Sequence, residues 1–393
     1  MNEERKQDRI WHCFCGTLLL YIATYCAVAR GGELSGDFPV HTQWALSLSR
    51  DTAWDFLSHK TAYPLWHIVV KLLYKWGLNP CGAAASATAL FQCLAYWCVG
   101  YVWSRMEKRK KCNANIWLWS LALFFMGPVY APACTYSYYL GQGTGNTYHN
   151  PTNIAVKGAA VLAFAICAEI LSEEKGIGKR KYLALSAVLL FSALAKPSFL
   201  QGMIPGLGLY VCLTVPGAGW KERLQKYCVM AAAFLPAAAV IFFQFFVSFF
   251  GETSEGIGIS YGRILHNWTP NLFVSFLLAF AFPITVLLLD WKRLCRDKGI
   301  RLLCCYELCA WLESAFLYEK GAREAHGNWL WGSYISMFVV WTVSLIRFSG
   351  FVGEKQESGR WKTAAAVGYA VFFLQVLCGI FYWYSFVGDI RFY

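Results

Sequence analysis

The segment GGELSGDFPVH, residues 31–41, follows directly on the first long apolar run of the chain, residues 10–29. It places two carboxylates, Glu33 and Asp37, among glycines, and a mixed apolar and polar stretch then leads to YPLWH at 63–67. An apolar run of about 20 residues crosses the hydrocarbon layer of a membrane as a helix. The pattern therefore predicts a spanning helix that leaves the bilayer where an acidic segment begins.

The composition extends this prediction to the whole chain, which has 393 residues, 57% of them hydrophobic and only 15% charged. That apolar share exceeds the share in soluble domains, and no polar block is long enough to form one. We expect a single integral membrane domain over 1–393, an all-α polytopic transmembrane bundle of about 11 spans. The expected spans are 10–29, 79–104, 113–133, 153–172, 181–195, 198–216, 227–250, 271–290, 302–318, 329–347 and 363–383.

The positions of the basic residues predict the orientation of the bundle. If the short apolar segment 63–77 lies on the membrane surface, most of the 35 Lys and Arg residues fall in loops on one side, while the loop 134–152 has none. An excess of Lys and Arg marks cytoplasmic loops, so we expect a cytoplasmic N-terminus. The net charge of +12 then indicates contact with anionic lipid, and no basic stripe suggests nucleic acid.

Four regions are expected on the outer side, where they would form the active-site face: 30–78, 134–152, 251–270 and 319–328. Within the first, 38–60 and 64–76 are expected to form helices along the outer membrane surface. In the second of these helices His67, Lys71 and Lys75 recur every four residues and would form one polar stripe. The stripe could hold a lipid-linked phosphate, or its long side chains could simply reach from the surface helix to water.

Asp37 is the leading catalytic candidate, with Glu33 four residues before it and His41 four residues after it. A carboxylate at this place could act as general base on an acceptor hydroxyl, or bind a divalent metal through oxygen. Asp37 could equally cap the helix that Pro39 begins, because Asp is preferred at that position.

The outer loop 134–152 is uncharged and rich in Tyr, Asn, Gln and Thr, which suits hydrogen bonding and stacking against sugars. It supplies Tyr148, His149 and Asn150 as candidate substrate-binding residues, and Asn150 before Pro151 also suits a helix start. A flexible connection is the alternative. The GQGTG string within it follows no buried strand, so a nucleotide loop is not indicated.

Lys196 lies between two expected spans, in strongly apolar sequence. An ionisable group at that depth costs up to about 3 kcal/mol unless it faces water or a partner. We expect Lys196 to line a cavity and contact phosphate, or else to be an ordinary interfacial lysine. Lys157, Glu307 and Glu313, which fall inside expected spans, raise the same question.

Glu319, Arg323 and His326 complete the candidates for substrate binding. Their i, i+4 and i+7 spacing would place them on one helical face near the outer end of the bundle. The alternative is that Glu319 and Arg323 form an ion pair that holds the loop in shape.

An acidic first outer loop, surface helices and YPLWH before the second span, all within a many-helix chain, resemble the GT-C superfamily of polytopic membrane glycosyltransferases, especially bacterial members. The resemblance implies a multi-pass protein of the bacterial plasma (inner) membrane. It also implies a polyprenyl-phosphate-linked sugar donor and a glycan or lipid-linked acceptor at the outer face. The catalytic or metal-binding role would fall on Asp37, with Glu33 as deputy. The family often has adjacent acids, whereas Leu34, Ser35 and Gly36 separate them here, so use of Mg²⁺ or Mn²⁺ stays open.

The expected reaction is attack of an acceptor hydroxyl, deprotonated by Asp37, on the anomeric carbon of the donor. Lys71, Lys75, Lys196 or Arg323 would stabilise the departing phosphate. Two alternatives remain: a transporter or flippase of lipid-linked intermediates, which needs a continuous polar path, and a polysaccharide polymerase, which would carry a larger outer loop.

Overall fold

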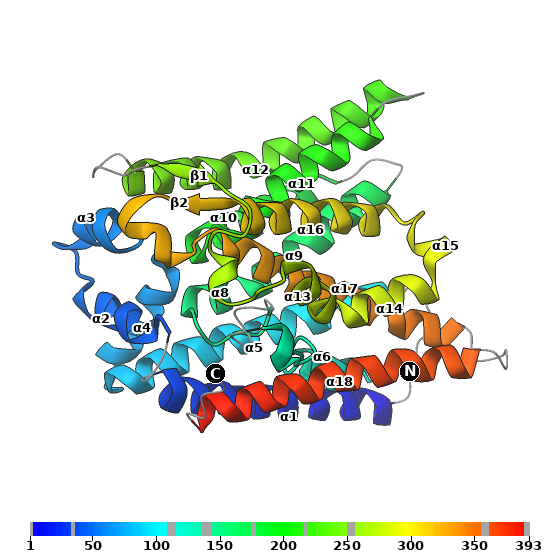
Figure 1. The fold of residues 1–393 in the computed structure, drawn as a ribbon, viewed down its shortest axis with the longest axis horizontal. Helices are drawn as coiled ribbons and strands as arrows, with labels where there is room; N and C mark the ends of the chain where they lie inside the picture. Colours follow the sequence, from blue (N-terminus) through cyan, green and yellow to red (C-terminus); the bar gives the residue numbers. More distant parts are fainter. Residues whose placement is uncertain are drawn as a thin grey trace.

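The computed structural model describes residues 3–32, 36–107, 115–135, 144–173, 178–215, 219–249, 256–354 and 361–388. These residues are almost entirely helical (Figure 1). The first half consists of α1 (Glu3–Cys26), η1 (Ala27–Gly32), α2 (Phe38–Ser47), α3 (Ala53–Asp55), η2 (Phe56–Lys60), α4 (Leu65–Lys75), α5 (Pro80–Glu107), α6 (Ile116–Leu123), η3 (Pro132–Cys134), α8 (Pro151–Ala155), α9 (Lys157–Ser172) and α10 (Lys179–Ala195).

The second half follows the same style, with one short pair of strands. Its elements are α11 (Ser198–Thr214), α12 (Trp220–Phe249), β1 (Ile257–Ile259), η4 (Leu265–Asn267), α13 (Leu272–Ala279), α14 (Ala281–Leu289), α15 (Trp291–Leu294), α16 (Lys298–Phe316), β2 (Leu317–Glu319), η5 (Gly321–His326), α17 (Leu330–Glu354) and α18 (Trp361–Val387). β1 and β2 pair antiparallel, with Gly258 opposite Tyr318.

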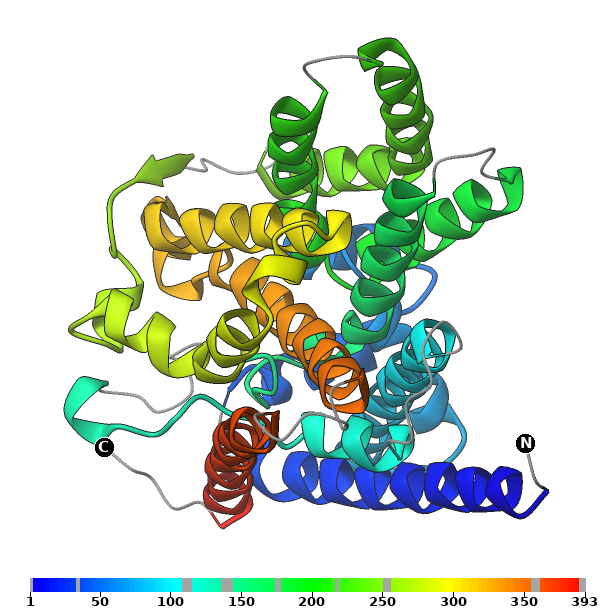
Figure 2. The same ribbon diagram turned by 90° about the vertical axis from the view of Figure 1, so that its right-hand side faces the viewer.

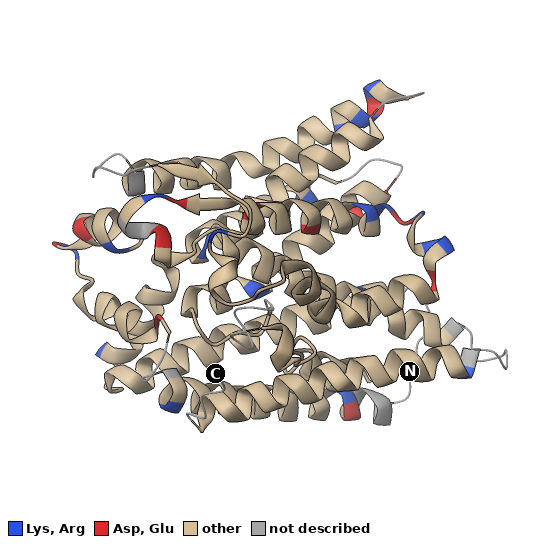
Figure 3. Cartoon of the chain, in the orientation of Figure 1, with Lys and Arg blue, Asp and Glu red and all other residues tan. Residues whose placement is uncertain are grey.

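The long helices lie side by side as a bundle, and α5, α9 and α17 form its interior (Figures 1 and 2). The peripheral helices α1, α12 and α18 leave most of their apolar surface outside the protein. Charged residues gather at the two ends of the bundle and are sparse between them (Figure 3). This arrangement suits a bilayer, because lipid tails cover apolar helix faces as well as protein does.

Among the residues that the structure describes, six helices are long and apolar enough to cross a membrane, or seven if a bent pair counts as one span. The prediction of an all-α bundle with several membrane helices is therefore confirmed, but the count of about 11 spans is not. Three expected spans are short: α10 and α11 have 17 residues each, and α6 has eight. A fourth, α16, carries Arg301, Glu307 and Glu313.

The bent pair is α13 and α14, whose axes differ by 63°. Side chains from two other helices bind the main-chain groups that the break would leave open. The Gln375 side chain accepts a hydrogen bond from the Phe282 N–H at 2.9 Å and donates to the carbonyls of Gly127 and Ala279 at 2.9 and 3.0 Å. Trp341 Nε1 also donates to the Ala279 carbonyl, at 3.0 Å. The bend is thus stabilised from inside the protein.

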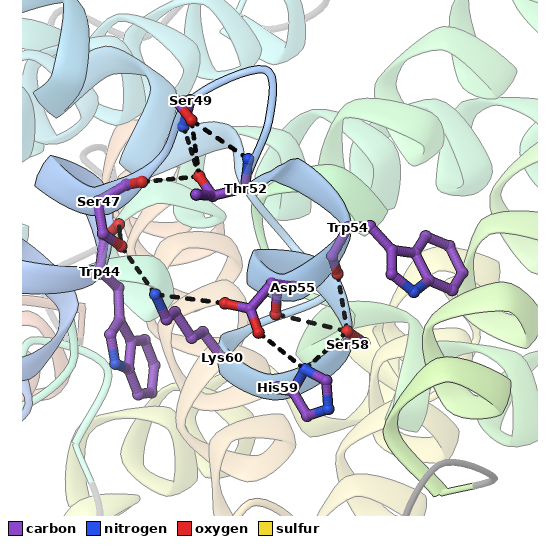
Figure 4. A network of polar contacts seen from close by, with 9 residues as sticks. All are labelled: Trp44, Ser47, Ser49, Thr52, Trp54, Asp55, Ser58, His59 and Lys60. Atoms are coloured by element: carbon purple, nitrogen blue, oxygen red, sulfur yellow. Dashed lines mark hydrogen bonds and ion pairs between the residues drawn. The ribbon is translucent and has the colours of Figure 1, made fainter.

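The segment expected as one surface helix over 38–60 is broken into α2, α3 and η2. Leu48 is extended after α2, and Ser and Thr side chains there bind the main chain instead of permitting another helical turn. Figure 4 shows the resulting network, in which Thr52 Oγ1 donates to the Ser47 carbonyl at 2.8 Å and Asp55 contacts both His59 and Lys60. The break folds η2 back toward α2 at the end of the bundle that carries Asp37.

Candidate functional site

Asp37 stands directly before α2, but its side chain makes no capping hydrogen bond to that helix. Oδ2 instead accepts a hydrogen bond from Nδ2 of Asn150 at 2.6 Å. The main-chain N–H of Asp37 donates to the His149 carbonyl at 2.8 Å, so the two segments are joined twice. Capping, the alternative role for Asp37, is therefore not what the structure shows.

Gly36 permits this junction for two reasons. Its φ of +73° lies in the left-handed region, which favours glycine. A Cβ atom at this position would also lie only 2.6 Å from the His149 carbonyl oxygen. Any larger residue would push the acidic segment away from the loop that carries His149 and Asn150.

Asn150 connects the acid to a buried cation. Its Oδ1 accepts hydrogen bonds from Nζ of Lys196 at 3.1 Å, from Oγ1 of Thr152 at 2.7 Å and from the N–H of Asn153 at 3.1 Å. The last of these bonds is an N-cap of α8, so the helix start fixes the orientation of the amide. With Oδ1 directed at Lys196, Nδ2 is directed at Asp37.

Lys196 occupies the extended link between α10 and α11 and is only 4% exposed. Its Nζ also contacts Thr152 Oγ1 at 3.4 Å and lies 4.8 Å and 5.5 Å from the ring centres of Trp331 and Tyr63. Aromatic faces stabilise a cation that has lost its water. Burial lowers the pKa of Lys196 to about 7, while the negative charge of Asp37 acts in the opposite direction.

His149 forms the third side of the cluster. Its ring stacks on Trp331, with centres 5.8 Å apart and planes 21° apart, and its Nε2 lies 3.8 Å from Oδ1 of Asp37. Burial lowers the pKa of His149, Asp37 raises it, and the positive charge of Lys196 lowers it further. A largely neutral imidazole therefore stands beside the carboxylate.

The cluster of Asp37, His149, Asn150 and Lys196 combines an accessible acid with an enclosed cation. The Asp37 side chain is 40% exposed, whereas Lys196 and Asn150 are buried. A substrate hydroxyl could therefore reach the carboxylate while an anionic group is drawn toward Lys196. The four residues come from three segments that are far apart in the chain, and all four were predicted as site residues.

His41 and His67, two further predicted substrate-binding residues, bind each other instead. Their Nδ1 and Nε2 atoms are 2.8 Å apart, and both side chains are buried among Phe56, Trp66 and their neighbours. Burial lowers the pKa of His41 well below its ordinary value and that of His67 to about 3. The pair is neutral at physiological pH and joins α2 to α4.

The expected polar stripe on α4 does not form, because its members point to different surroundings. His67 faces the interior, Lys71 Nζ donates to the Leu46 carbonyl of α2, and Lys75 is exposed. Leu72 and Trp76 are exposed, as expected for a helix that meets lipid. The structure therefore brings neither lysine to the Asp37 cluster.

Tyr148 is 3% exposed and packs on Tyr382 and Phe386, behind the cluster. Its main-chain N–H is not free to bind a substrate either, because it donates a hydrogen bond to the Tyr382 hydroxyl at 3.0 Å. Glu33 lies outside the described residues. Tyr148 is thus placed as a packing residue that supports the loop carrying His149.

The helical spacing expected for Glu319, Arg323 and His326 is absent. Glu319 ends strand β2, and the other two lie on the 3-10 turn η5. Glu319 is buried and accepts a hydrogen bond from Asn328 Nδ2 at 3.0 Å, while His326 is exposed. The Arg323 side chain is not among those described. The chain turns sharply at Gly321 and Gly327, both at positive φ, which prevents one continuous helix.

Thr152, Tyr63 and Trp331 contact the cluster, although the sequence analysis did not name them as site residues. Tyr63 lies in the YPLWH motif and Thr152 follows Asn150-Pro151, so both stood beside predicted residues. Trp331 is the second residue of α17, 135 positions after Lys196, and only the packing of α17 brings its ring to the lysine. One aromatic among many in an apolar helix gives no sequence signal.

The described residues do not form a resident divalent-metal site. No three His, Cys, Asp or Glu side chains gather in a metal-binding arrangement within the part of the chain that the structure describes. Asp37 accepts an amide hydrogen bond and faces the charge of Lys196, which would oppose a second cation. The arrangement of these described residues therefore does not fit a resident divalent metal.

Comparison with known proteins leaves the geometry as the guide to function. No protein-family model matches the chain, and no curated protein matches it in sequence.

Proposed function

We propose that the chain is a membrane glycosyltransferase that transfers a sugar from a polyprenyl-phosphate-linked donor to a glycan or lipid-linked acceptor. One observation carries the proposal: Asn150 bridges the half-exposed carboxylate of Asp37 and the buried ammonium of Lys196. Transfer from a lipid phosphate needs a base for the acceptor and a cation for the leaving group. The chain, which is rich in membrane helices, places both beside one another at one end of the bundle.

In the proposed reaction Asp37 accepts the proton of the acceptor hydroxyl as its oxygen attacks the anomeric carbon. The bond between that carbon and the phosphate oxygen breaks, and the departing lipid phosphate takes the electron pair. Lys196 faces the developing charge in a water-poor setting, where a cation stabilises it far more than in water. The donor's single phosphodiester charge also raises the pKa of Lys196, which keeps the lysine protonated once the donor is bound.

Two partly exposed aromatic side chains at the cluster, Tyr63 and His149, could contact a sugar. His149 stacks on buried Trp331, and the Tyr63 ring centre lies 5.5 Å from the Lys196 ammonium. Such rings pack against the apolar faces of pyranose rings while their polar edges bind hydroxyls. We expect the opposite end of the bundle, where most Lys and Arg residues gather, to face the cytoplasm, so that this cluster would lie at the outer face of the membrane.

The test compares Asp37→Asn with Asp55→Asn by mass spectrometry of lipid-linked glycans in cells that express each form. Both acids lie on the same surface segment, but the Asp55 side chain pairs with exposed His59 and partly buried Lys60, away from the cluster. A general base contributes about 10²–10⁴-fold, so Asp37→Asn is expected to abolish detectable transfer while the protein stays inserted. Asp55→Asn is expected to retain it. Full activity of Asp37→Asn would remove the assignment, and Glu33→Gln shows whether the second acid contributes.

Transport of a lipid-linked intermediate is the second candidate, and buried Glu307 favours it. This carboxylate of α16 borders an apolar cavity of about 450 Å³ between α13, α14, α16 and α17. The surroundings of Lys157 disfavour an open polar path, because its ammonium lies between Asn146, Phe124 and Phe338. Movement of a labelled lipid across reconstituted vesicles without a change in its mass would favour transport.

A further inference from the structure

A cavity bordered by described residues lies at the opposite end of the bundle from Asp37. It measures about 510 Å³ and is enclosed by α5, α9, α10 and α17, with the start of α16 at its edge. Figure 2 looks onto this end of the molecule. The cavity shares no residue with the Asp37 cluster, so its role is separate from the proposed transfer reaction.

The cavity wall has two chemical parts. Val161, Phe164, Val343 and Ile346 are among the apolar residues that line its interior. Four cations border it: Arg105, Arg180 and Lys181, each near the end of its helix, and Arg347, which lies two turns before the end of α17. An apolar interior with a basic rim matches a molecule that has both acyl chains and an anionic head group.

The carboxylates of the rim do not neutralise its cations. Glu169 lies 3.2 Å from Arg105 and 3.6 Å from Lys181, and is shared between them. Asp297 lies 2.6 Å from Arg347 and also caps α16. Lys181 pairs further with Glu173, just outside the wall. Even with that third carboxylate counted, four cations face three acids among the side chains that the structure describes here.

Arg180 supplies the charge that is most available to a ligand. It is exposed at the start of α10, in the same turn as the paired Lys181. Arginine offers several N–H donors in a plane that fits two phosphate oxygens at once. The rim is therefore suited to a phosphate group, with Arg180 exposed and Arg105 and Arg347 held by their carboxylate partners.

We propose that this cavity binds an anionic phospholipid from the leaflet at the basic end of the bundle. The phosphate would lie among Arg105, Arg180 and Arg347, and an acyl chain would enter between α9 and α17. The apolar interior favours a lipid over a free phosphate ion, which has nothing to place there. The basic loops at this end add the long-range attraction to an anionic membrane surface that brings such lipids close.

The test uses the full-length protein in detergent and in nanodiscs of phosphatidylglycerol or phosphatidylcholine, with native mass spectrometry and thermal melting as readouts. We expect phosphatidylglycerol to remain bound after phosphatidylcholine is lost and to raise Tm more. Arg180→Glu is expected to reduce retained phosphatidylglycerol by at least about fivefold, the order expected for one membrane-proximal cation. Lys292→Glu, exposed at the same end and outside the cavity, is the matched control and should retain it.

A second variant tests the apolar part of the site. Ala165→Phe places a ring inside the cavity and should also reduce retention, while leaving every rim charge in place. Equal retention of both lipids would overturn the proposal. So would equal loss in Arg180→Glu and Lys292→Glu, which indicates general surface attraction. An equal rise in Tm with inorganic phosphate alone would show a free-anion site and overturn the lipid assignment.

Discussion

Asn150 Nδ2 lies 2.6 Å from Asp37 Oδ2, although 113 residues separate them in the chain. The same amide accepts from Lys196 through its other atom, so one side chain sets the distance between an acid and a cation. An amide is suited to this position because it is a donor at one end and an acceptor at the other. Asp and Glu have no such polarity when ionised.

Replacement of Asn150 should lower transfer without unfolding the protein. Asn150→Asp puts a second carboxylate against Asp37, and Asn150→Ser is too short to bridge, yet both residues are good N-caps for α8. We expect at least about a tenfold loss of transfer for each, as for other groups that position a catalytic residue. Asn271→Ser is the control, because Asn271 caps α13 through the same type of bond to the Val274 N–H. Equal transfer by the Asn150 and Asn271 variants would contradict the bridging role.

The charge on Lys196 should control donor binding as a function of pH. Its pKa of about 7 means that the free protein loses this cation as pH rises through neutrality. A sugar phosphodiester stays ionised over this range, so the lysine sets the trend. Donor affinity measured from pH 6 to 8.5 should therefore fall with rising pH in the wild type. Lys196→Arg should bind with little pH dependence, and Lys196→Met weakly throughout; the same slope in Lys196→Arg would exclude Lys196 as its source.

Substitution at Gly36 separates backbone strain from displacement of the acid. Gly36→Ala should destabilise the protein by about 1–2 kcal/mol through its positive φ, and should also lower transfer because its Cβ collides with the His149 carbonyl. Gly77→Ala is the matched control: its φ is +100°, but no atom lies within 4 Å of the added Cβ. Both variants should melt at lower temperature, and only Gly36→Ala should lose transfer.

Acid should weaken the contact between α2 and α4. The pKa of His67 is about 3 in the folded protein against an ordinary value of 6.5, so the unfolded chain binds more protons between these values. The contribution of His67 to stability is complete above pH 6.5 and is lost as pH falls toward 3. At pH 5 this loss is about 2 kcal/mol. Thermal melting at pH 7.5 and 5 should show a smaller acid shift in His67→Asn than in the wild type, while exposed His59→Asn should not change it.

The sequence named all four members of the Asp37 cluster as candidates, because they are chemically conspicuous in an apolar chain. A carboxylate after a spanning run and a lysine between apolar segments each have a high cost in the membrane, and each needs a partner. It could not identify which partner, since Asn150 meets both only after α8 and the link between α10 and α11 have packed. The all-helical nature of the chain was likewise evident from the sequence, but the short lengths of α6, α10 and α11 were not.

The two predicted polar faces that do not form, on α4 and at 319–326, were both based on the assumption that helical spacing continues unbroken. His67 and Lys71 share a helical face by count, yet His67 is buried against its neighbours, Lys71 binds the main chain of α2, and Lys75 is exposed. Glu319 and His326 are seven residues apart, but a strand end and glycines at positive φ intervene. Local side-chain bonds and tertiary packing override periodicity in such short segments.

The bend between α13 and α14 has a consequence for how the bundle moves. Hydrocarbon offers no hydrogen bonds, so main-chain groups exposed by a break must find partners within the protein. Gln375 and Trp341 supply them from two different helices, and Gly379 lets α18 approach the Phe125 carbonyl closely enough for Gln375 to reach. If α13 and α14 straightened into one helix, the hydrogen bonds that Phe282 and Ala279 make with Gln375 and Trp341 would break together. We therefore expect the bend to keep its angle, and any opening of the bundle toward lipid to occur at another place.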